Sequence, residues 1–426
     1  MNIDRKKHPK YNNIEHINFP KVKKVSLDNG IPVYIINGCT QDIFKLDIMI
    51  GAGAVYGNDR LTAPVTTLML NEGTKKHSAQ KIAEIFDYYG AYFQPSTEKD
   101  MAFGSLISLN KHIEKTLPVF ADIINDSIFP ERELKILIDR QRHNFLIDLE
   151  KTSFVARELF NQKLFGENHP YGRRIAIEQY DNINRNDIVD FYKKYYKPSN
   201  FSFILSGKIT DKHINLLNSL FGQLEADNKP VVEKIPLETK FSATPYISEK
   251  EKAVQSSVRM GMITVIKNHP DYYNLRILTT ILGGYFGSRL MKNIREDKGY
   301  TYGINALQVS FLQAGFIGIM TDVKSETTQS AIDEVFKEIK RLKKEKVGIE
   351  ELNLVRNYMM GEFMEMFDGP FAVSDTFKAV LQYNMGFEYF KNFKQKILTI
   401  TPDELIETAN KYFDTDKIIT VVSGKI

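Results

Sequence analysis

The chain has 426 residues, of which 42% are hydrophobic and 26% charged, and its net charge at pH 7 is +4. This composition is typical of a soluble globular protein long enough for two ordinary domains, and it excludes an intrinsically disordered chain. The small net charge gives no indication of nucleic-acid binding. The single cysteine, Cys39, excludes an intrachain disulfide and a cysteine-based structural zinc site.

The N-terminal residues MNIDRKKHPKYNN are charged and are not followed by an apolar segment. We therefore expect no secretory signal. No apolar run reaches the roughly 20 residues that a membrane-spanning helix needs. These features predict a cytoplasmic protein with no membrane partner and no nucleic-acid partner.

The first half of the chain alternates between strand and helix patterns. VSLDNGIPVYII (25–36) predicts two strands joined by an Asn-Gly turn. Ser78 is the expected N-cap of a helix over 78–89, because its hydroxyl can accept a bond from a free backbone N–H group. The other predicted elements are a strand over 44–56, a helix over 62–71, strands over 91–96 and 101–109, and helices over about 112–126 and 131–164.

An internal repeat organises the whole chain. Residues 183–209 align without gaps to residues 400–426, so the second copy lies about half a chain length after the first. Both copies contain an amphipathic helix that ends in an aromatic pair, followed by a short polar loop and an apolar strand ending in Ser-Gly-Lys-Ile. A period of this length indicates a duplicated domain.

The duplication and the order of elements predict an α+β fold of two homologous domains, each a mainly antiparallel β-sheet with helices packed on one face. We expect an N-terminal domain over 1–225, a linker over 226–252 rich in Pro, Lys and Glu, and a C-terminal domain over 253–426. In the second domain, the sequence predicts a strand over 254–266 and helices over about 271–282 and 330–346.

Residues 282–303, LGGYFGSRLMKNIREDKGYTYG, form the most informative stretch. They begin with a glycine-rich turn and continue as a short amphipathic helix, with Leu290, Met291 and Ile294 on one face. Arg295 and Tyr302 follow near a second turn. A guanidinium and a phenol are suited to bind a peptide carbonyl or carboxylate.

Three of these features together identify a resemblance. The opening SLDNGIPVYI hairpin, the segment 71–100 and the two α+β halves resemble the insulinase/pitrilysin superfamily, and more closely its short two-domain branch of processing-peptidase-like subunits. The most specific matching segments are 73–83, HPYGR (169–173) and GSRLMKNIREDKGYTYG (287–303). The resemblance covers nearly the whole chain.

Peptide-cleaving members of this superfamily carry H-x-x-E-H on a helix, where two His side chains bind zinc and the Glu acts as general base. Counting back from Gly73-Thr74, the corresponding positions are Pro64, Thr67 and Leu68. Pro and Leu offer no metal ligand, and a Thr hydroxyl does not replace the carboxylate. The third ligand of the family, a Glu, would fall near residues 143–145, which are His-Asn-Phe here.

The eight histidines lie at least five positions apart, so no local pair suggests a zinc site elsewhere. We therefore expect that this chain binds no metal and does not hydrolyse peptides alone. The zinc would belong to a partner subunit.

In contrast to the zinc ligands, the substrate-binding residues of the family have counterparts in the second half. Active members hold substrate with an Arg and a Tyr seven positions apart, and the resemblance assigns this role to Arg295 and Tyr302, with the phenol near the developing oxyanion. Tyr300 is a candidate by proximity. Ser288 and Arg289 are candidates for the same substrate site, with helix capping and a surface ion pair as the alternative.

The resemblance implies a non-catalytic, substrate-binding subunit of a heterodimeric zinc metallopeptidase, paired with a homologous subunit that bears H-x-x-E-H. Peptide would add as a strand to a sheet edge, with 91–97 at the corresponding edge of the first half. One alternative is a structural or chaperone-like homologue without a peptidase role. A phosphate-binding enzyme using the turn Gly283-Gly284-x-x-Gly287-Ser288 is a third hypothesis, but this pattern is neither a dinucleotide fingerprint nor a P-loop.

Overall fold

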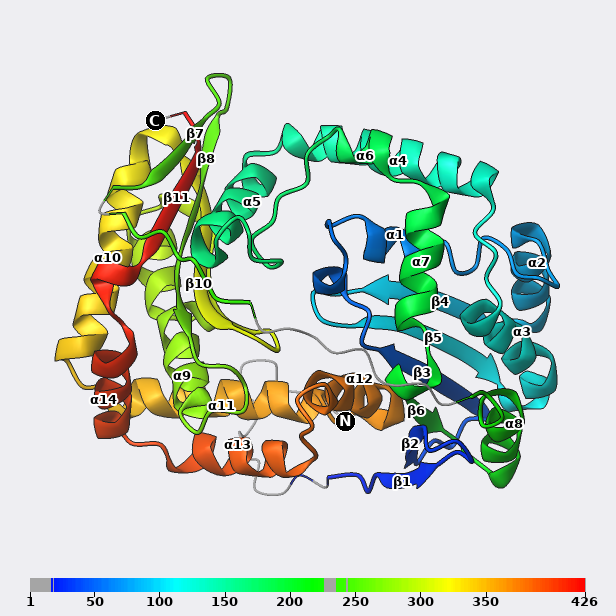
Figure 1. The fold of residues 1–426 in the computed structure, drawn as a ribbon. Coiled ribbons are helices and arrows are strands. Elements are labelled where there is room, and N and C mark those ends of the chain that lie inside the picture. The colour runs from blue at the N-terminus through cyan, green and yellow to red at the C-terminus, as the bar shows by residue number, and fades with distance from the viewer. Residues whose placement is uncertain (1–16, 18, 226–234, 243, 426) are drawn as a thin grey trace, which may run out of the picture.

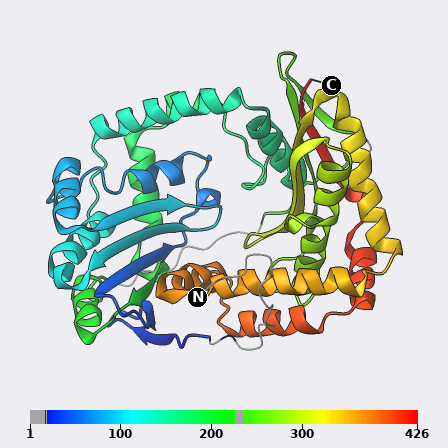
Figure 2. The same cartoon turned by 180° about the vertical axis from the view of Figure 1, so that it is seen from behind.

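The computed structural model describes residues 17, 19–225, 235–242 and 244–425. One β-sheet belongs to each half of the sequence, and the two sheets stand on opposite sides of the molecule (Figure 1). Helix α4 (Glu131–Leu149) runs between the halves along one edge, and α11 (Ile349–Glu365) lies along the other, as the view from behind also shows (Figure 2). The predicted α+β fold of two homologous halves is confirmed.

Both sheets are mainly antiparallel. Within the described residues, the first sheet has six strands in the order β1 (Lys23–Ser26), β2 (Pro32–Asn37), β6 (Phe201–Gly207), β3 (Ile43–Ile50), β5 (Ala102–Leu109) and β4 (Tyr92–Thr97). The second sheet has five, in the order β7 (Tyr246–Glu249), β11 (Ile419–Gly424), β8 (Gln255–Thr264), β10 (Gly315–Lys324) and β9 (Thr301–Ser310). Strands β4 and β9 therefore form corresponding edges.

The repeat found in the sequence occupies the same place in both sheets. Strand β6 pairs in parallel with β2 and antiparallel with β3, and β11 pairs in parallel with β7 and antiparallel with β8. The helix before each strand starts with a capping box, at Asn184 for α7 (Arg185–Tyr195) and at Thr401 for α14 (Pro402–Tyr412). The duplication is therefore a duplication of structure.

The remaining helices lie between the strands in chain order in both halves. In the first half they are α1 (Thr62–Leu68), α2 (Ala79–Tyr89), α3 (Ile113–Asn125), α5 (Thr152–Phe165), α6 (Gln179–Asn182) and α8 (Asp211–Phe221). In the second half they are α9 (Tyr272–Thr279), the π-helical turns η4 (Thr280–Gly284) and η5 (Met291–Asp297), α10 (Thr328–Lys344), α12 (Gly369–Leu381) and α13 (Glu388–Thr399).

Helices α5 and α12 are exchanged between the halves. Their first residues, Thr152 and Gly369, are separated by the same offset as the two copies of the sequence repeat. Helix α5 belongs to the first half but packs against β8 and β11 of the second sheet, whereas α12 packs against β2 and β6 of the first. Each sheet is thus covered on one face by its own helices and contacted on the other by a helix of the opposite half, so the two halves share their cores.

A buried charge network fixes α12 on the first sheet. Lys45 and Asp47 alternate along β3 with apolar residues and so point to the face that α12 covers. The Lys45 ammonium lies 2.6 Å from the Asp375 carboxylate, and the Lys378 ammonium lies 3.0 Å from the Asp47 carboxylate. Ser374 also donates to Asp47 at 2.7 Å. Because Asp47 is fully buried, these partners are needed to offset the cost of its charge.

Most of the predicted elements are confirmed, including the N-cap role of Ser78, whose side chain accepts from the Lys81 N–H. The helix predicted over 131–164 is two helices, because the chain turns at Glu150 and Lys151 between α4 and α5. The predicted linker also needs correction. Residues 226–234 lie outside the described residues, but strand β7 falls within 226–252 and pairs with β11, so the second sheet begins inside that segment.

Candidate functional site

Helix α1 carries Pro64, Thr67 and Leu68, the places that the resemblance assigned to two zinc-binding His side chains and a general base. It is a short helix whose first N–H groups are capped by Asp59, which accepts from the backbone of Leu61 at 2.7 Å and of Thr62 at 2.8 Å. Pro64 and Leu68, four residues apart, both line a cavity of about 610 Å³. They present only carbon to that cavity.

Thr67 faces the protein core instead. It is fully buried, and its hydroxyl lies 2.8 Å from the Tyr196 hydroxyl and donates to the Ala63 carbonyl at 3.0 Å. Burial raises the pKa of Tyr196, so its phenol stays neutral. At the place that the resemblance assigned to a general base, Thr67 thus makes hydrogen bonds within the fold.

The third ligand of the family was expected near residues 143–145 from the spacing in the family. On α4, Gln141 lines the cavity, whereas His143 and Asn144 are exposed and Phe145 is packed in the core. The side chain that lines the cavity is thus a neutral amide, two to four residues before the expected place. Helical spacing could have identified it, because Gln141 lies four residues from both Leu137 and Phe145, which are buried.

These residues do not fit a zinc ion. Zinc is bound by Cys, His and carboxylate side chains, and none of these stands at the three motif positions. Across the described ranges, no three His, Cys, Asp or Glu side chains come together in a way that could hold a metal.

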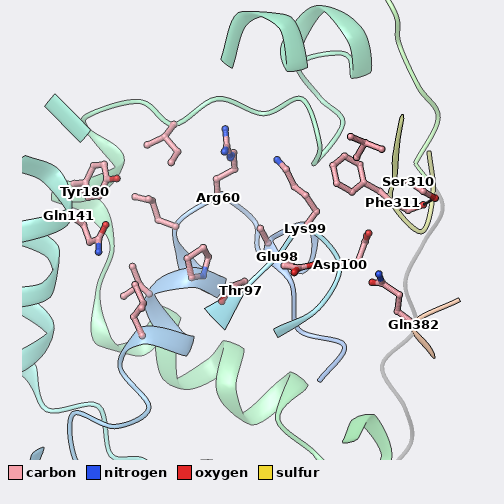
Figure 3. A pocket seen from close by; sticks show the side chains of 17 residues that line it. Arg60, Thr97, Glu98, Lys99, Asp100, Gln141, Tyr180, Ser310, Phe311 and Gln382 are labelled. Atoms are coloured by element: carbon pink, nitrogen blue, oxygen red, sulfur yellow. Dashed lines mark hydrogen bonds between the residues drawn. The ribbon is translucent and has the colours of Figure 1, made fainter. Parts of the chain in front are cut away.

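The cavity lies between the two halves of the chain. Its lining comes from α1, the end of β4, α4 and the end of β9, with Gln382 after α12 (Figure 3). Its cations are Arg60 and Lys99, which point the same way from neighbouring segments (Figure 3). Arg60 pairs with the buried Glu158 and donates to the Arg173 carbonyl at 2.9 Å. Burial and the nearby Arg60 lower the pKa of Lys99 to about 8.

Asp100 and Tyr171 join the halves beside this cavity. The Tyr171 hydroxyl donates to Asp100 at 2.5 Å and accepts from the Gln313 N–H at 3.2 Å. The other Asp100 oxygen accepts from the Leu312 N–H at 2.9 Å. Tyr171 belongs to the HPYGR segment, and Leu312 and Gln313 form the turn between β9 and β10. Burial raises the pKa of both Asp100 and Tyr171, although the hydrogen bond from Tyr171 opposes this shift at Asp100.

The second half places its predicted residues on an exposed surface. The Arg295 guanidinium lies 4.5 Å from the centre of the Phe286 ring and 5.3 Å from that of Tyr302. Tyr302 is 90% exposed and Phe286 is 62% exposed. Within the described part of the chain, Arg295 forms neither an ion pair nor a side-chain hydrogen bond. We call Phe286, Arg295 and Tyr302 the aromatic-arginine cluster.

The residues around the cluster explain how it is held. Leu290, Met291 and Ile294 are buried, as predicted, and fix the turn η5 on the core. A Cβ atom on Gly283 would lie 2.7 Å from Ala306 of β9, so only glycine allows this close approach of the turn to the strand. Tyr300 is half-buried and packs against the core rather than joining the cluster.

Ser288 and Arg289 are not part of the exposed cluster. The Arg289 Nε and Nη2 atoms donate to the two Glu351 carboxylate oxygens at 2.7 Å and 2.8 Å. Ser288 is 1% exposed. The ion pair that was the alternative for Arg289 is therefore present, and it ties the turn to α11.

The cavity and the cluster lie at opposite ends of β9. Tyr302 is near the start of this strand, and Val309, Ser310 and Phe311 at its end line the cavity. Seven residues of extended chain span about 23 Å. Arg295 and Tyr302 are consequently remote from Pro64 and Leu68 of the same chain.

Comparisons with known proteins agree with this architecture. Residues 33–164 match the family model described as Insulinase (Peptidase family M16), and residues 182–359 match the model described as Peptidase M16 inactive domain. The chain belongs to the insulinase/pitrilysin superfamily.

Similar proteins within the superfamily include an uncharacterized zinc protease of Bacillus subtilis, which is 25% identical over 80% of this chain and 84% of its own length. The mitochondrial-processing peptidase subunit beta of Bos taurus is 22% identical over 95% of this chain and 85% of its own. The crystal structure of a peptidase M16 inactive domain from Pseudomonas fluorescens superposes with a TM-score of 0.86, at 24% identity, over 95% of this chain and 98% of that one.

Every helix in the described ranges is too short or too polar to cross a membrane. Sequence reasoning missed Phe286 as the partner of Arg295, although its place four residues before Leu290 in the glycine-rich turn could have drawn attention to it.

Proposed function

We propose that this chain is the non-catalytic, substrate-binding subunit of a heterodimeric zinc metallopeptidase. Its partner would be a homologous subunit with an intact H-x-x-E-H motif, and the zinc would be bound there. Arg295 and Tyr302 would contact the peptide held at the partner's zinc site.

The observation that carries the proposal is the exposure of the aromatic-arginine cluster. A guanidinium that has no carboxylate partner among the described residues and a phenol that is 90% exposed contribute little to the stability of their own chain. Such groups are suited to bind a peptide carbonyl or carboxylate, because both are hydrogen-bond donors. Their distance along β9 from Pro64 and Leu68 favours action at a site on another subunit.

The identity of the motif residues supports the same division of roles. Pro64 and Leu68 give the cavity carbon walls, and Thr67 is bonded to Tyr196. The first half thus has no group in these places that could activate water, while the second half keeps side chains that could hold a substrate.

The proposal is tested by purifying the tagged chain from its native source and identifying the proteins bound to it. We expect a homologous subunit with H-x-x-E-H, zinc in that subunit, and peptide hydrolysis only when both chains are present. A stable complex that contains no metallopeptidase would favour the structural or chaperone-like alternative. Hydrolysis by the isolated chain, with bound zinc, would contradict the proposal.

A further inference from the structure

The cavity at α1 combines apolar walls with cationic groups. Pro64, Val65 and Leu68 of α1 line it together with Phe311 from the end of β9. Its volume of about 610 Å³ lies in the range of small-ligand sites, about 300–1,000 Å³. A mostly apolar cavity with a few polar groups is the usual form of a site for an organic molecule.

Lys99 supplies a positive charge that the chain itself does not neutralise. Among the described residues, no carboxylate forms an ion pair with Lys99, and its ammonium donates only to the Tyr171 carbonyl, at 3.3 Å. The neighbouring carboxylates are already engaged, because Glu158 pairs with Arg60 and both oxygens of Asp100 accept hydrogen bonds. A buried cation without a paired anion is costly, and an incoming anion would relieve that cost.

A second polar group in the cavity also lacks a partner. The hydroxyl oxygen of Thr97 is buried, and within the described residues it makes no hydrogen bond. Thr97 ends strand β4 and lines the cavity with Lys99. Because this oxygen has almost no accessible surface, a ligand could reach it only after a local shift of side chains.

We propose that this cavity binds an organic carboxylate with an apolar body. The carboxylate would contact the Lys99 ammonium and the Arg60 guanidinium, and the apolar body would lie against Pro64, Val65 and Leu68. Two sources share this chemistry, namely the C-terminal residue of a peptide and a free carboxylic acid. The site belongs to this chain alone and requires no partner subunit, so it can fail or succeed independently of the proposed function.

The charges around Lys99 are compatible with anion binding. Arg60 and Arg157 lie near it as cations, and Glu158 and Asp100 as anions. Glu98, which also lines the cavity, has the cations Lys378 and Lys267 and the anion Asp100 near it. Because the pKa of Lys99 is about 8, its ammonium is the charged form at neutral pH.

The test is isothermal titration calorimetry on the full chain with paired probes. N-acetylphenylalanine and a pentapeptide ending in phenylalanine are compared with the same molecules carrying a C-terminal amide. 3-Phenylpropanoate represents the free acids. We expect each carboxylate probe to bind at least about tenfold more tightly than its amide. The amide cannot form the charge-assisted hydrogen bond with the Lys99 ammonium.

The matched variants are Lys99→Met, which keeps the apolar stem, and Lys81→Met, an exposed lysine on α2. Lys99→Met should lose the preference for the carboxylate, and Lys81→Met should keep it. In the wild-type chain, carboxylate affinity should also fall above about pH 8, as Lys99 loses its proton.

The affinities of the peptide acid and of the free acid show which kind of carboxylate the cavity prefers. Tighter binding of the pentapeptide acid identifies a peptide C-terminus, and tighter binding of 3-phenylpropanoate identifies a free acid. Equal affinity for acid and amide in the wild-type chain would overturn the proposal, whatever the behaviour of the variants. So would the absence of binding by all carboxylates.

Discussion

The cavity at α1 and the aromatic-arginine cluster differ in how their side chains are bonded to the rest of the chain. In the first half, residues beside the cavity are hydrogen-bonded within the fold, as Thr67 is to Tyr196 and Asp100 is to Tyr171. In the second half, Arg295 and Tyr302 contact each other but are not otherwise bonded by side-chain hydrogen bonds within the described residues.

The difference predicts how substitutions in the two regions affect the stability of the chain. A buried polar group that loses its partner costs about 1–3 kcal/mol, whereas an exposed group costs little. Substitutions in the first region should therefore change the free energy of unfolding. Substitutions in the second should change only what the chain does with other molecules.

The largest effect on stability is expected for Tyr171→Phe. The fully buried Tyr171 hydroxyl joins Asp100 of the first half to the Gln313 N–H of the second. Its loss leaves Asp100 buried with fewer donors, so the free energy of unfolding should fall by about 2–3 kcal/mol. Urea unfolding measures the change, and Tyr88→Phe, at an 82% exposed site, is the control. Equal free energies of unfolding for the two variants would contradict the claim that the Tyr171 hydroxyl stabilises the contact between the halves.

Thr67→Val should have the next largest effect. It removes the hydroxyl that lies 2.8 Å from that of Tyr196 and leaves a buried phenol without this partner. We expect a loss of about 1–2 kcal/mol in unfolding free energy. Thr66→Val is the matched control, because the buried Thr66 hydroxyl bonds only to the helix carbonyl of Thr62. A larger loss for Thr66→Val would show that Thr67 is not a structural residue.

Lys99→Met tests the electrostatics of the first region. Burial lowers the pKa of Lys99 to about 8 in the folded chain, whereas an unfolded lysine has a pKa of about 10.4. The unfolded state binds more protons between these values, so this lysine makes stability rise with pH there. Lys99→Met should flatten the slope by about 1 kcal/mol per pH unit. Urea unfolding at pH 8, 9 and 10 measures it, with Lys81→Met as control. The pKa of Lys267 is also about 8, but this residue is present in both variants and therefore does not contribute to the difference between their slopes.

The smallest effect on stability is expected in the aromatic-arginine cluster. Arg295→Ala combined with Tyr302→Phe changes a half-buried and an exposed group that make no side-chain hydrogen bond within the described residues, so the free energy of unfolding should change by less than about 0.5 kcal/mol. Thermal unfolding of the isolated chain checks this. A loss of about 2 kcal/mol, the size expected for a buried contact, would mean that the pair supports the fold and would end the contrast between the two regions.

The fold followed from local patterns where these were strong. The long-period repeat predicted two equivalent halves, and the segment 44–56 was predicted to contain a strand. The exchange of α5 and α12 was not predictable, because an apolar helix face does not say which sheet it will cover. Nor could the pairing of Lys45 with Asp375, 330 residues away, be found in a periodicity.

Only part of the candidate site was predicted, because contacts between distant segments leave no local pattern in the sequence. The resemblance, counted back from Gly73-Thr74, pointed to Pro64 and Leu68, and positions i and i+4 share a helix face. It did not show that Thr67 bonds to Tyr196, or that Lys99 lies beside Arg60, because those contacts join segments far apart in the chain. The spacing of Arg295 and Tyr302 identified a pair but not its distance from the cavity.

The central claim is that Arg295 and Tyr302 act on a peptide held by another subunit. The direct measurement is kcat/KM for peptide hydrolysis by the two-subunit complex, with Arg295→Ala plus Tyr302→Phe compared with the exposed control pair Arg132→Ala plus Tyr88→Phe. The claim predicts a fall of about 100-fold for the first pair at unchanged complex stability, and no change for the control. Wild-type kcat/KM in the first pair would contradict it.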